Sequence, residues 1–203
     1  KKFRVAFSQC QGGDEWRKQM FAEMKRELSF HDNIEFIYRD AEADSKKQLS
    51  QINELVKLKI DLLIVSPNEI QPLSSRIAQI YDSGIPVVLI DRGINSNKYT
   101  AFIGASNFEV GQNAGRYAVS VLKGKGTLVE AMGLSDASPF IERHKGLIDI
   151  ISQQPGITLL KTLEDHTVDY EKKLTATLLT EKNIDLIFAQ SDYIAKDVYK
   201  ICK

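Results

Sequence analysis

The sequence predicts an α/β protein with two lobes, each built on a doubly wound parallel sheet. Short apolar runs without polar alternation recur along the 203 residues, and segments with apolar residues at helical spacing separate them. Such runs are typical of strands buried on both faces, and their alternation with helices favours parallel strands joined by right-handed crossovers. Polar breaks on both sides of a short strand at 101–103 indicate a crossing between lobes, so we expect lobes at 1–104 and 105–203. A single sheet of eight strands is the alternative arrangement.

The first half of the chain alternates four expected strands with three amphipathic helices. Ser45 is a candidate N-cap for the second helix, and Gly84, followed by Pro86, is a C-terminal stop for the third. The apolar positions at helical spacing are Trp16, Met20, Met24 and Leu28 in the first helix and Leu49, Ile52, Leu55, Val56 and Leu58 in the second. The expected strands are 3–8, 34–38, 61–65 and 87–90, and the expected helices are 14–30, a segment beginning at Ser45, and 73–83.

The second half repeats the alternation from the short strand at 101–103 onward. Asn107 is a candidate N-cap for the helix that follows this strand. The further expected strands are 127–131, 158–163 and 184–189, and the expected helices are 108–122, 139–152, 170–180 and one that starts at about 193. The pattern therefore predicts the same architecture in both halves.

Composition and charge argue against several functional classes. The chain has 27 basic and 27 acidic residues and a formal net charge of zero, which gives no electrostatic case for nucleic-acid binding. No apolar stretch approaches the roughly 20 residues that span a bilayer. The two cysteines, Cys10 and Cys202, are too few for a disulfide framework, and we expect both to be small half-buried thiols. The dispersed histidines His31, His144 and His166 form no metal-binding motif.

The sequence also lacks the patterns expected of a nucleotide-binding protein or a hydrolase. Its glycines form neither a phosphate-binding loop of the Gly-x-x-x-x-Gly-Lys-Ser/Thr kind nor a Gly-x-Gly-x-x-Gly turn. Ser8 and Cys10 follow the first strand, but no histidine lies in a motif that would activate either as a nucleophile. We therefore predict no catalytic residue, no cofactor and no metal.

The most informative polar residues follow an apolar strand. Residues 86–92 read Pro-Val-Val-Leu-Ile-Asp-Arg, so Asp91 and Arg92 come at the carboxyl end of the strand. Ligands bind at that edge of open α/β sheets. A carboxylate supplies acceptors and a guanidinium supplies a fixed fork of donors, a combination suited to a polyhydroxylated molecule. An exposed turn with two solvated charges is an equally acceptable interpretation of these two residues taken alone.

Five short segments carry a more specific signal. They are Val-Ala-Phe-Ser-Gln at 5–9 with Trp16-Arg17, Val-Leu-Ile-Asp-Arg at 88–92, Ile-Gly-Ala-Ser-Asn at 103–107, Glu-Arg-His-Lys-Gly at 142–146 and Phe-Ala-Gln-Ser-Asp at 188–192. In this order they resemble the type I periplasmic sugar-binding proteins, the ribose and galactofuranose binders. The similarity covers the whole chain, and within the family it is greatest to the sensor domains of hybrid two-component histidine kinases that detect sugars such as fructose.

The resemblance implies a fold and a ligand site. Members of the family have two α/β lobes joined by a hinge, with a sugar bound in the cleft between them. On that basis Asp91 and Arg92 match a first-lobe pair that hydrogen-bonds sugar hydroxyls, and Arg143 matches a second-lobe arginine that does the same. The other positions that match or lie near family ligand contacts are Trp16, Arg17, Ser191 and His166.

Two departures from the family pattern affect these expectations. Ser191 stands where the family usually has asparagine, which replaces an amide by a shorter hydroxyl. The family fold also continues with a further strand and a return to the first lobe, whereas this chain stops at Lys203. We therefore expect both lobes to be incomplete and the C-terminal part of the fold to be missing from this chain.

Each candidate residue also has a purely structural interpretation. Trp16 is in phase with the apolar face of the first helix and fits a core, although its ring is equally suited to stacking on a sugar. Ser191 fits the N-cap of the last helix, and His166 fits an ordinary loop position. Asp91, Arg92 and Arg143 could instead form surface ion pairs worth about 0–1 kcal/mol. The resemblance favours the ligand interpretation for these three.

The function implied by the resemblance is the non-enzymatic, extracytoplasmic sensing of a monosaccharide such as fructose, ribose or galactofuranose. The expected partner is a membrane-attached kinase region of the same polypeptide. This places the domain in the periplasm, tethered to the inner membrane. A homodimer is compatible with this role. The alternatives are a solute-binding protein that serves the permease of a sugar ABC transporter, the effector core of a LacI-type transcription repressor, and a small α/β enzyme. A helix-turn-helix upstream of Lys1 would indicate the repressor, and turnover of a bound ligand would indicate the enzyme.

Overall fold

The computed structural model describes residues 2–164, 170–181 and 183–202, and the chain divides into two compact units. Unit 1 comprises Lys1–Ala105 and unit 2 comprises Ser106–Lys203. Each unit has a parallel sheet of its own, so the predicted pair of doubly wound sheets is confirmed and the single eight-stranded sheet is wrong. In the described ranges, no helix is both long enough and apolar enough to cross a membrane.

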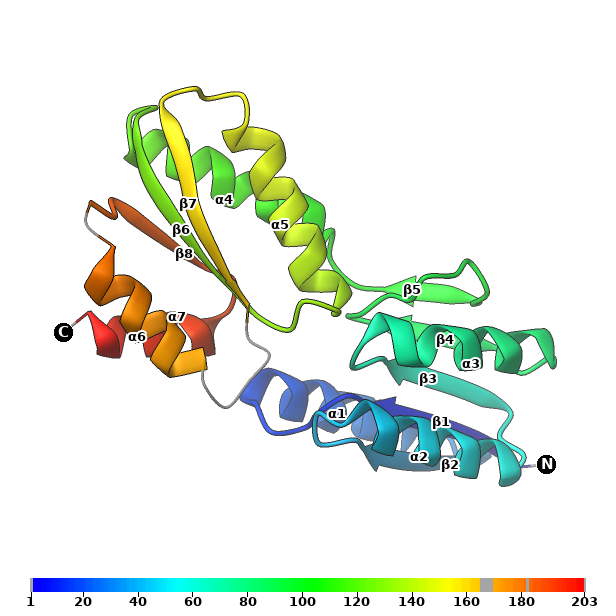
Figure 1. Cartoon of the computed structure of the whole chain (residues 1–203). Helices are drawn as coiled ribbons and strands as arrows, with labels where there is room; N and C mark the ends of the chain where they lie inside the picture. The colour runs from blue at the N-terminus through cyan, green and yellow to red at the C-terminus, as the bar shows by residue number, and fades with distance from the viewer. Residues whose placement is uncertain (1, 165–169, 182, 203) are drawn as a thin grey trace. The chain divides into compact units, whose positions relative to one another are not determined.

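Unit 1 contains five strands and three helices. Along the chain they are β1 (Phe3–Gln9), α1 (Glu15–Leu28), β2 (Ile34–Asp40), α2 (Ser45–Lys57), β3 (Leu62–Ser66), α3 (Ile70–Asp82), β4 (Val87–Ile90) and β5 (Ala101–Ile103). All strands are parallel and their order in the sheet is β2-β1-β3-β4-β5 (Figure 1). The chain therefore reverses its direction across the sheet at β1, with Phe7 paired to Tyr38 on one side and to Ile64 on the other.

Helices cover both faces of this sheet, as a doubly wound topology requires. On one face Ile52 and Leu55 of α2 and Ile77 of α3 are fully buried against strand residues. On the other face the ring of Phe21 of α1 contacts the ring of Tyr38, with centroids 4.1 Å apart. The cover on this second face is thinner, because α1 contains no buried residue.

Unit 2 repeats the architecture with fewer strands. Its elements are α4 (Asn107–Val121), β6 (Gly126–Met132), α5 (Ser138–Ile151), β7 (Ile157–Glu164), α6 (Tyr170–Thr180), β8 (Leu186–Ala189) and α7 (Asp192–Ile201). The strand order is β7-β6-β8, with α4 and α5 on one face and α6 and α7 on the other (Figure 1). Adjacent residues of β6 point to opposite faces, since Leu128 packs with Leu147 of α5 whereas Val129 packs with Leu174 of α6 and Ile194 of α7.

Helices α4 and α5 pack closely because glycines face the backbone of the partner helix. A Cβ atom at Gly111 of α4 would clash with the carbonyl oxygen of Arg143 on α5, and a Cβ atom at Gly146 of α5 would clash with the carbonyl oxygen of Phe108. Glycine is therefore required at both positions for this approach. The contact fixes the part of α5 that carries Arg143 against α4.

In two helices the N-cap is the residue before the predicted one. Asp44, not Ser45, caps α2, because its carboxylate accepts two backbone N–H bonds from the first turn. Ser106, not Asn107, caps α4, and its hydroxyl accepts the N–H of Glu109. At each place two adjacent residues of capping type compete for one position. The displaced Ser45 and Asn107 lie inside their helices, where their side chains make tertiary contacts instead.

Other predictions have mixed outcomes. The strand positions and the stop at Gly84, whose φ is 91°, are confirmed. Leu58 is 43% exposed because it follows the last turn of α2, and α3 begins at Ile70, earlier than predicted. The expectation of two half-buried thiols is wrong, since Cys10 is fully buried at the end of β1 and Cys202 is exposed.

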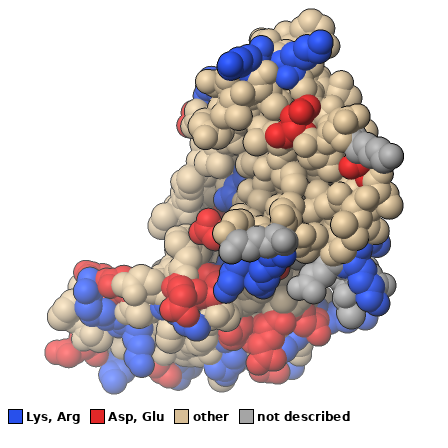
Figure 2. Space-filling view, turned by 90° about the vertical axis from the view of Figure 1, so that its left-hand side faces the viewer, with Lys and Arg blue, Asp and Glu red and all other residues tan. Residues whose placement is uncertain are grey.

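Acidic and basic side chains are interspersed on the face shown in Figure 2 and form no continuous basic field there. This distribution agrees with the balance of 27 basic and 27 acidic residues in the sequence. The visible face therefore gives no support to a nucleic-acid interface, which needs a basic stripe or patch.

Candidate functional site

In unit 1 the predicted acidic and basic pair lies at the carboxyl end of β4. Asp91 and Arg92 follow Ile90, the last residue of that strand. The Asp91 N–H donates to the carbonyl oxygen of Ile103 on β5 at 2.9 Å. The φ of Asp91 is 64°, in the left-handed region that aspartate tolerates better than most residues. This turn therefore fixes where the Asp91 carboxylate leaves the sheet edge.

Arg92 is not a solvated charge, since the residue is only 5% exposed. Its Nη1 donates to the carbonyl oxygen of Asn68 at 2.6 Å and lies 3.5 Å from Asn68 Oδ1. Its buried Nε has no hydrogen-bond partner among the described residues. An unpaired buried donor of this kind carries a cost in stability.

A buried network of amides and hydroxyls holds Asn68 in place. The Asn68 N–H donates to Gln48 Oε1 at 2.8 Å, and Asn68 Nδ2 donates to Ser45 Oγ at 3.0 Å. Gln48 Nε2 donates to the Ser66 carbonyl oxygen at 2.9 Å and to Ser8 Oγ at 3.2 Å. The network therefore ties α2 to the carboxyl ends of β1 and β3, next to the group that binds Arg92.

The sequence did not predict Gln48 and Asn68 as parts of the site. Gln48 is fully buried and lies in phase with the apolar Ile52 and Leu55 of α2. A polar side chain on the apolar face of a helix was the signal available for it. Asn68 offered no such signal, because its partners Gln48 and Arg92 are both distant from it in the sequence.

The start of α1 brings a second arginine to Asp91. Asp14 caps this helix by accepting the Arg17 N–H at 2.9 Å, and its other oxygen accepts from Arg17 Nη1 at 2.6 Å. Arg17 Nη2 also donates to Asp91 Oδ2 at 3.3 Å. The structure therefore brings together the predicted Arg17 and Asp91 and adds Asp14 to them.

The charges of this cluster stabilise one another. Burial would lower the pKa of Arg17, but the neighbouring Cys10, Asp14 and Asp91 raise it above its ordinary value on balance. Burial likewise raises the pKa of Asp14, but the N–H and guanidinium of Arg17 more than offset this and hold that pKa below its ordinary value. Both groups are therefore charged at neutral pH.

Trp16 stands at the same helix start with 56% of its surface exposed, so the interpretation of this residue as core is wrong. The Cζ of Arg17 lies 5.6 Å from the centre of its ring, within the range of a cation–π contact. Helical phase misled here because α1 contains no buried residue. The ring offers an exposed apolar face beside the pair formed by Arg17 and Asp91.

In unit 2 the predicted Arg143 on α5 is held by two other elements. Its Nε donates to Asn107 Oδ1 at 2.9 Å, and its Nη1 donates to the carbonyl oxygen of Gln190 at 2.6 Å. Asn107 is 3% exposed and is the first residue of α4, while Gln190 directly follows β8. The Cζ of Arg143 also lies 5.9 Å from the centre of the Phe140 ring. Its guanidinium is therefore oriented at the carboxyl end of the sheet of unit 2.

A buried carboxylate binds the side chain of Gln190, the residue whose carbonyl accepts from Arg143. Glu130 in β6 is fully buried and accepts from Gln190 Nε2 at 2.5 Å and from Thr162 Oγ1 at 3.1 Å. The same carboxylate lies 2.6 Å from His144 Nδ1. The sequence did not predict Glu130 or Gln190 as parts of the site. An acid in the middle of an otherwise apolar strand was the signal available for Glu130.

The two remaining predicted residues have different outcomes. Ser191 caps α7, as its structural interpretation predicts, with its hydroxyl 3.5 Å from the Ile194 N–H. It adjoins Gln190 and so lies next to the carbonyl that binds Arg143. His166 lies outside the described residues. In the part of the chain that the structure describes, no group of three or more His, Cys, Asp or Glu side chains could hold a metal ion.

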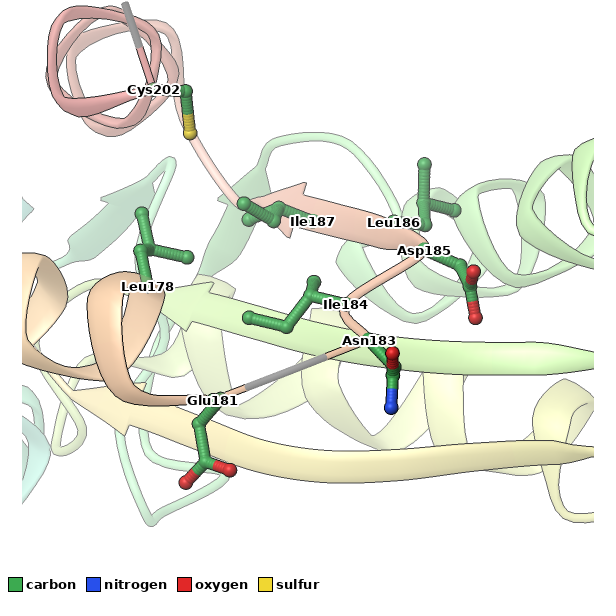
Figure 3. A pocket seen from close by; sticks show the side chains of 8 residues that line it. All are labelled: Leu178, Glu181, Asn183, Ile184, Asp185, Leu186, Ile187 and Cys202. Carbon is green, nitrogen blue, oxygen red and sulfur yellow. The ribbon is translucent and has the colours of Figure 1, made fainter.

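A separate hollow in unit 2 lies along β8 (Figure 3). Side chains from α6, from β8 and the segment before it, and from the end of α7 line it, including Leu178, Asp185, Ile187 and Cys202. None of the predicted site residues is part of its lining. We therefore do not assign this hollow to the candidate site.

Several known proteins are similar to this chain. The ribose import binding protein RbsB of Bacillus subtilis is 27% identical over 168 residues, which cover 80% of this chain and 53% of that protein. The galactofuranose-binding protein YtfQ of Escherichia coli is 25% identical over 197 residues, which cover 93% of this chain and 62% of that protein. The solved fructose-binding periplasmic domain of a hybrid two-component system matches with a TM-score of 0.93 and 38% identity, over 98% of this chain and 67% of that one.

These matches confirm the resemblance predicted from the five segments. The chain spans 53% and 62% of the two curated relatives, so it corresponds to less than two thirds of the length of either. The family model described as the periplasmic binding protein domain matches residues 5–201, which is nearly the whole chain. This protein chain therefore belongs to the periplasmic binding protein family.

Proposed function

We propose that the chain binds a monosaccharide through two groups of side chains, one at the sheet edge of each unit. One observation carries the proposal: each unit orients an arginine through an Nη1 bond of 2.6 Å to a backbone carbonyl, Arg92 to Asn68 and Arg143 to Gln190. Guanidinium groups fixed in this way are rigid donors for hydroxyl oxygens. Rigid donors matter because each sugar hydroxyl left unpaired on burial costs about 1–3 kcal/mol.

Each candidate residue has a distinct role in this proposal. Asp91 accepts hydrogen bonds from sugar hydroxyls while Arg17 holds its carboxylate in place. Arg92 and Arg143 donate to hydroxyl oxygens, and the exposed ring of Trp16 packs on the apolar C–H face of the sugar. The names of the relatives, which include binders of ribose, galactofuranose and fructose, support this class of ligand. Contacts from Ser191 and His166 stay predictions.

We further propose that this domain is the ligand-sensing part of a hybrid two-component signalling protein, located in the periplasm and tethered to the inner membrane. The 38% identity to a fructose-binding domain of such a system supports this role. A sugar that binds one arrangement of the two units more tightly than another increases the population of that arrangement. The shift would be transmitted to a membrane-attached kinase region of the same polypeptide.

Sugar transport is the second candidate function. The 27% identity to a ribose import binding protein supports a solute-binding protein that delivers its sugar to a permease. The two roles are separated by their readouts in the cell. A sensor shows sugar-dependent phosphorylation of the full-length protein, whereas a transport protein is required for uptake of the sugar.

A thermal-shift screen of the full-length protein against fructose, ribose, galactose and arabinose tests the binding proposal. Ligand at about 100 times its Kd adds roughly 2.7 kcal/mol of stability, which raises the melting temperature visibly. We expect a rise with one sugar that disappears in Arg143→Ala. No rise with any sugar in well-folded protein would refute the proposal.

A further inference from the structure

Glu130 occupies a position that the proposed binding role does not by itself explain. It lies on β6, the central strand of the sheet of unit 2, and it is fully buried. Burying a carboxylate is unfavourable, and replacing buried charges with apolar groups of similar volume is often neutral or stabilising. Stability alone is therefore a weak reason for an acid at this position.

The two oxygens of this carboxylate serve different partners. Oε1 accepts from Gln190 Nε2, and Oε2 accepts from Thr162 Oγ1 and contacts His144 Nδ1. The side chain of His144 is 35% exposed, whereas Gln190 is 4% exposed. One oxygen is thus directed to a half-exposed group and the other to a residue of the interior.

Gln190 is held at both its backbone and its side chain. Its N–H donates to the carbonyl oxygen of Ala131 at 3.0 Å, and its amide nitrogen donates to the neighbouring Glu130 at 2.5 Å. Its carbonyl oxygen in turn accepts from Arg143 Nη1 at 2.6 Å. A continuous chain of hydrogen bonds therefore runs from the centre of the sheet to the arginine.

The orientation of the Gln190 amide follows from the acceptor oxygen that Glu130 presents to it. A carboxylate accepts only, so it must face the NH₂ group of the amide rather than the oxygen. The Gln190 Oε1 is accordingly left buried, without a partner among the described residues. The cluster thus retains an unpaired buried acceptor, which is a cost to stability.

We propose that Glu130 is a positioning residue for Arg143, acting through Gln190. The carboxylate fixes the peptide after β8, and that peptide presents its carbonyl to the guanidinium, so the arginine is oriented before a ligand arrives. Preorganisation of this kind lowers the cost of binding. The inference rests on the proposed function, because the role of Arg143 as a ligand is assigned there.

The test compares substitutions that break different ends of the cluster in the full-length protein. Glu130→Met removes both acceptor oxygens at similar volume, and Glu130→Gln restores an acceptor for Gln190. Thr162→Val is the matched control, because it removes only a partner of Oε2. Two quantities are measured: the Kd of the sugar identified in the thermal screen, and the NMR resonance of the Arg143 Nε–H in protein with ¹⁵N-labelled arginine, assigned by its loss in Arg143→Lys.

We expect Glu130→Met to weaken sugar affinity about tenfold, the effect of one lost charge-assisted contact, and to shift the Arg143 Nε–H resonance. Glu130→Gln should recover most of both effects, and Thr162→Val should leave both unchanged. In an Arg143→Lys background Glu130→Met should cause no further loss of affinity, because the effect is transmitted through the arginine. Equal losses in both backgrounds would overturn the inference.

The resonance separates this inference from the proposed function. If the wild-type protein binds no sugar, the proposed function fails, whereas a shifted Nε–H resonance in Glu130→Met still supports positioning. An unmoved resonance in that variant overturns the inference even if sugar binds. Should Glu130→Met fail to fold, Gln190→Met takes its place, because it removes the amide that Glu130 binds and keeps the backbone carbonyl that accepts from Arg143. A shift in Gln190→Met but not in Thr162→Val supports the inference, and a shift in neither overturns it.

Discussion

The two units hold an arginine in the same way but support it with different chemistry. In unit 1 the carbonyl that accepts from Arg92 is backed by the neutral amides of Asn68 and Gln48. In unit 2 the carbonyl that accepts from Arg143 is backed by the ionisable Glu130. The bond from Nη1 to the carbonyl oxygen is 2.6 Å in both. A similar donor geometry can therefore be built with neutral groups or with a charge.

The difference matters because of where each arginine lies. Arg92 is 5% exposed and needs many neutral partners to stay in the interior, whereas Arg143 is half-buried. The acid nearest to Arg92 in sequence, Asp91, pairs with Arg17 instead. In unit 1 the buried Arg92 is therefore separate from the ion pair of Asp91 and Arg17. In unit 2 Gln190 connects Arg143 to the buried Glu130.

The largest expected effect distinguishes the two arginines directly. Arg92→Ala and Arg143→Ala should each weaken sugar binding by roughly a hundredfold or more, since each removes charged hydrogen bonds worth about 1.5–3 kcal/mol apiece. Both substitutions should lower the stability of the sugar-free protein, because each leaves a carbonyl of a buried residue unpaired. Arg92→Ala should lower it more, because Arg92 is itself buried and its loss also leaves a cavity, whereas Arg143 is half-buried. Titration calorimetry and melting temperatures measure the two effects. Equal destabilisation by both substitutions would break the comparison.

A smaller effect is expected at the neutral network of unit 1. Gln48→Leu should destabilise the protein by about 2 kcal/mol, because groups on Asn68, Ser66 and Ser8 lose their partner together. Urea denaturation measures the change. Gln51→Leu is the matched control on the same helix, since Gln51 donates to the carbonyl oxygen of Asp40 and belongs to no such network. A loss no larger than in this control would show that the amides are dispensable.

The smallest effect concerns the ion pair between Asp14 and Arg17 in unit 1. The pKa of Asp14 is below its ordinary value of 3.8, so Asp14 contributes stability that is present above this pH and is lost as the pH falls through the lowered pKa. Asp14→Asn should therefore reduce the melting temperature at pH 7, and the difference from wild type should shrink below pH 4. The side chain of Asp14 is 36% exposed, so solvent screening limits the effect to below about 1 kcal/mol. If the difference in melting temperature between Asp14→Asn and wild type persists at the lowest pH, Asp14 stabilises the protein only as an uncharged helix cap.

Local signals predicted the fold well and the site only in part. The strands were found because apolar runs such as Val87–Ile90 report burial on both faces regardless of distant contacts. Helix starts were missed where adjacent capping residues compete, as at Asp44 and Ser45. Asn68 and Gln190, whose carbonyl groups bind the arginines, were missed because each arginine lies far away in the sequence, and no local pattern reveals such a contact.

The position of the Arg143 side chain depends on the glycine contact between α4 and α5, although neither Gly111 nor Gly146 is a candidate ligand contact. The methyl group that Gly111 lacks would fall on the carbonyl of Arg143 itself. An alanine there would push α5 outward and carry the guanidinium away from Asn107 and Gln190 together. The distance between the two helices thus determines where the Arg143 guanidinium lies, and any change to the proposed sugar site would have to preserve this distance.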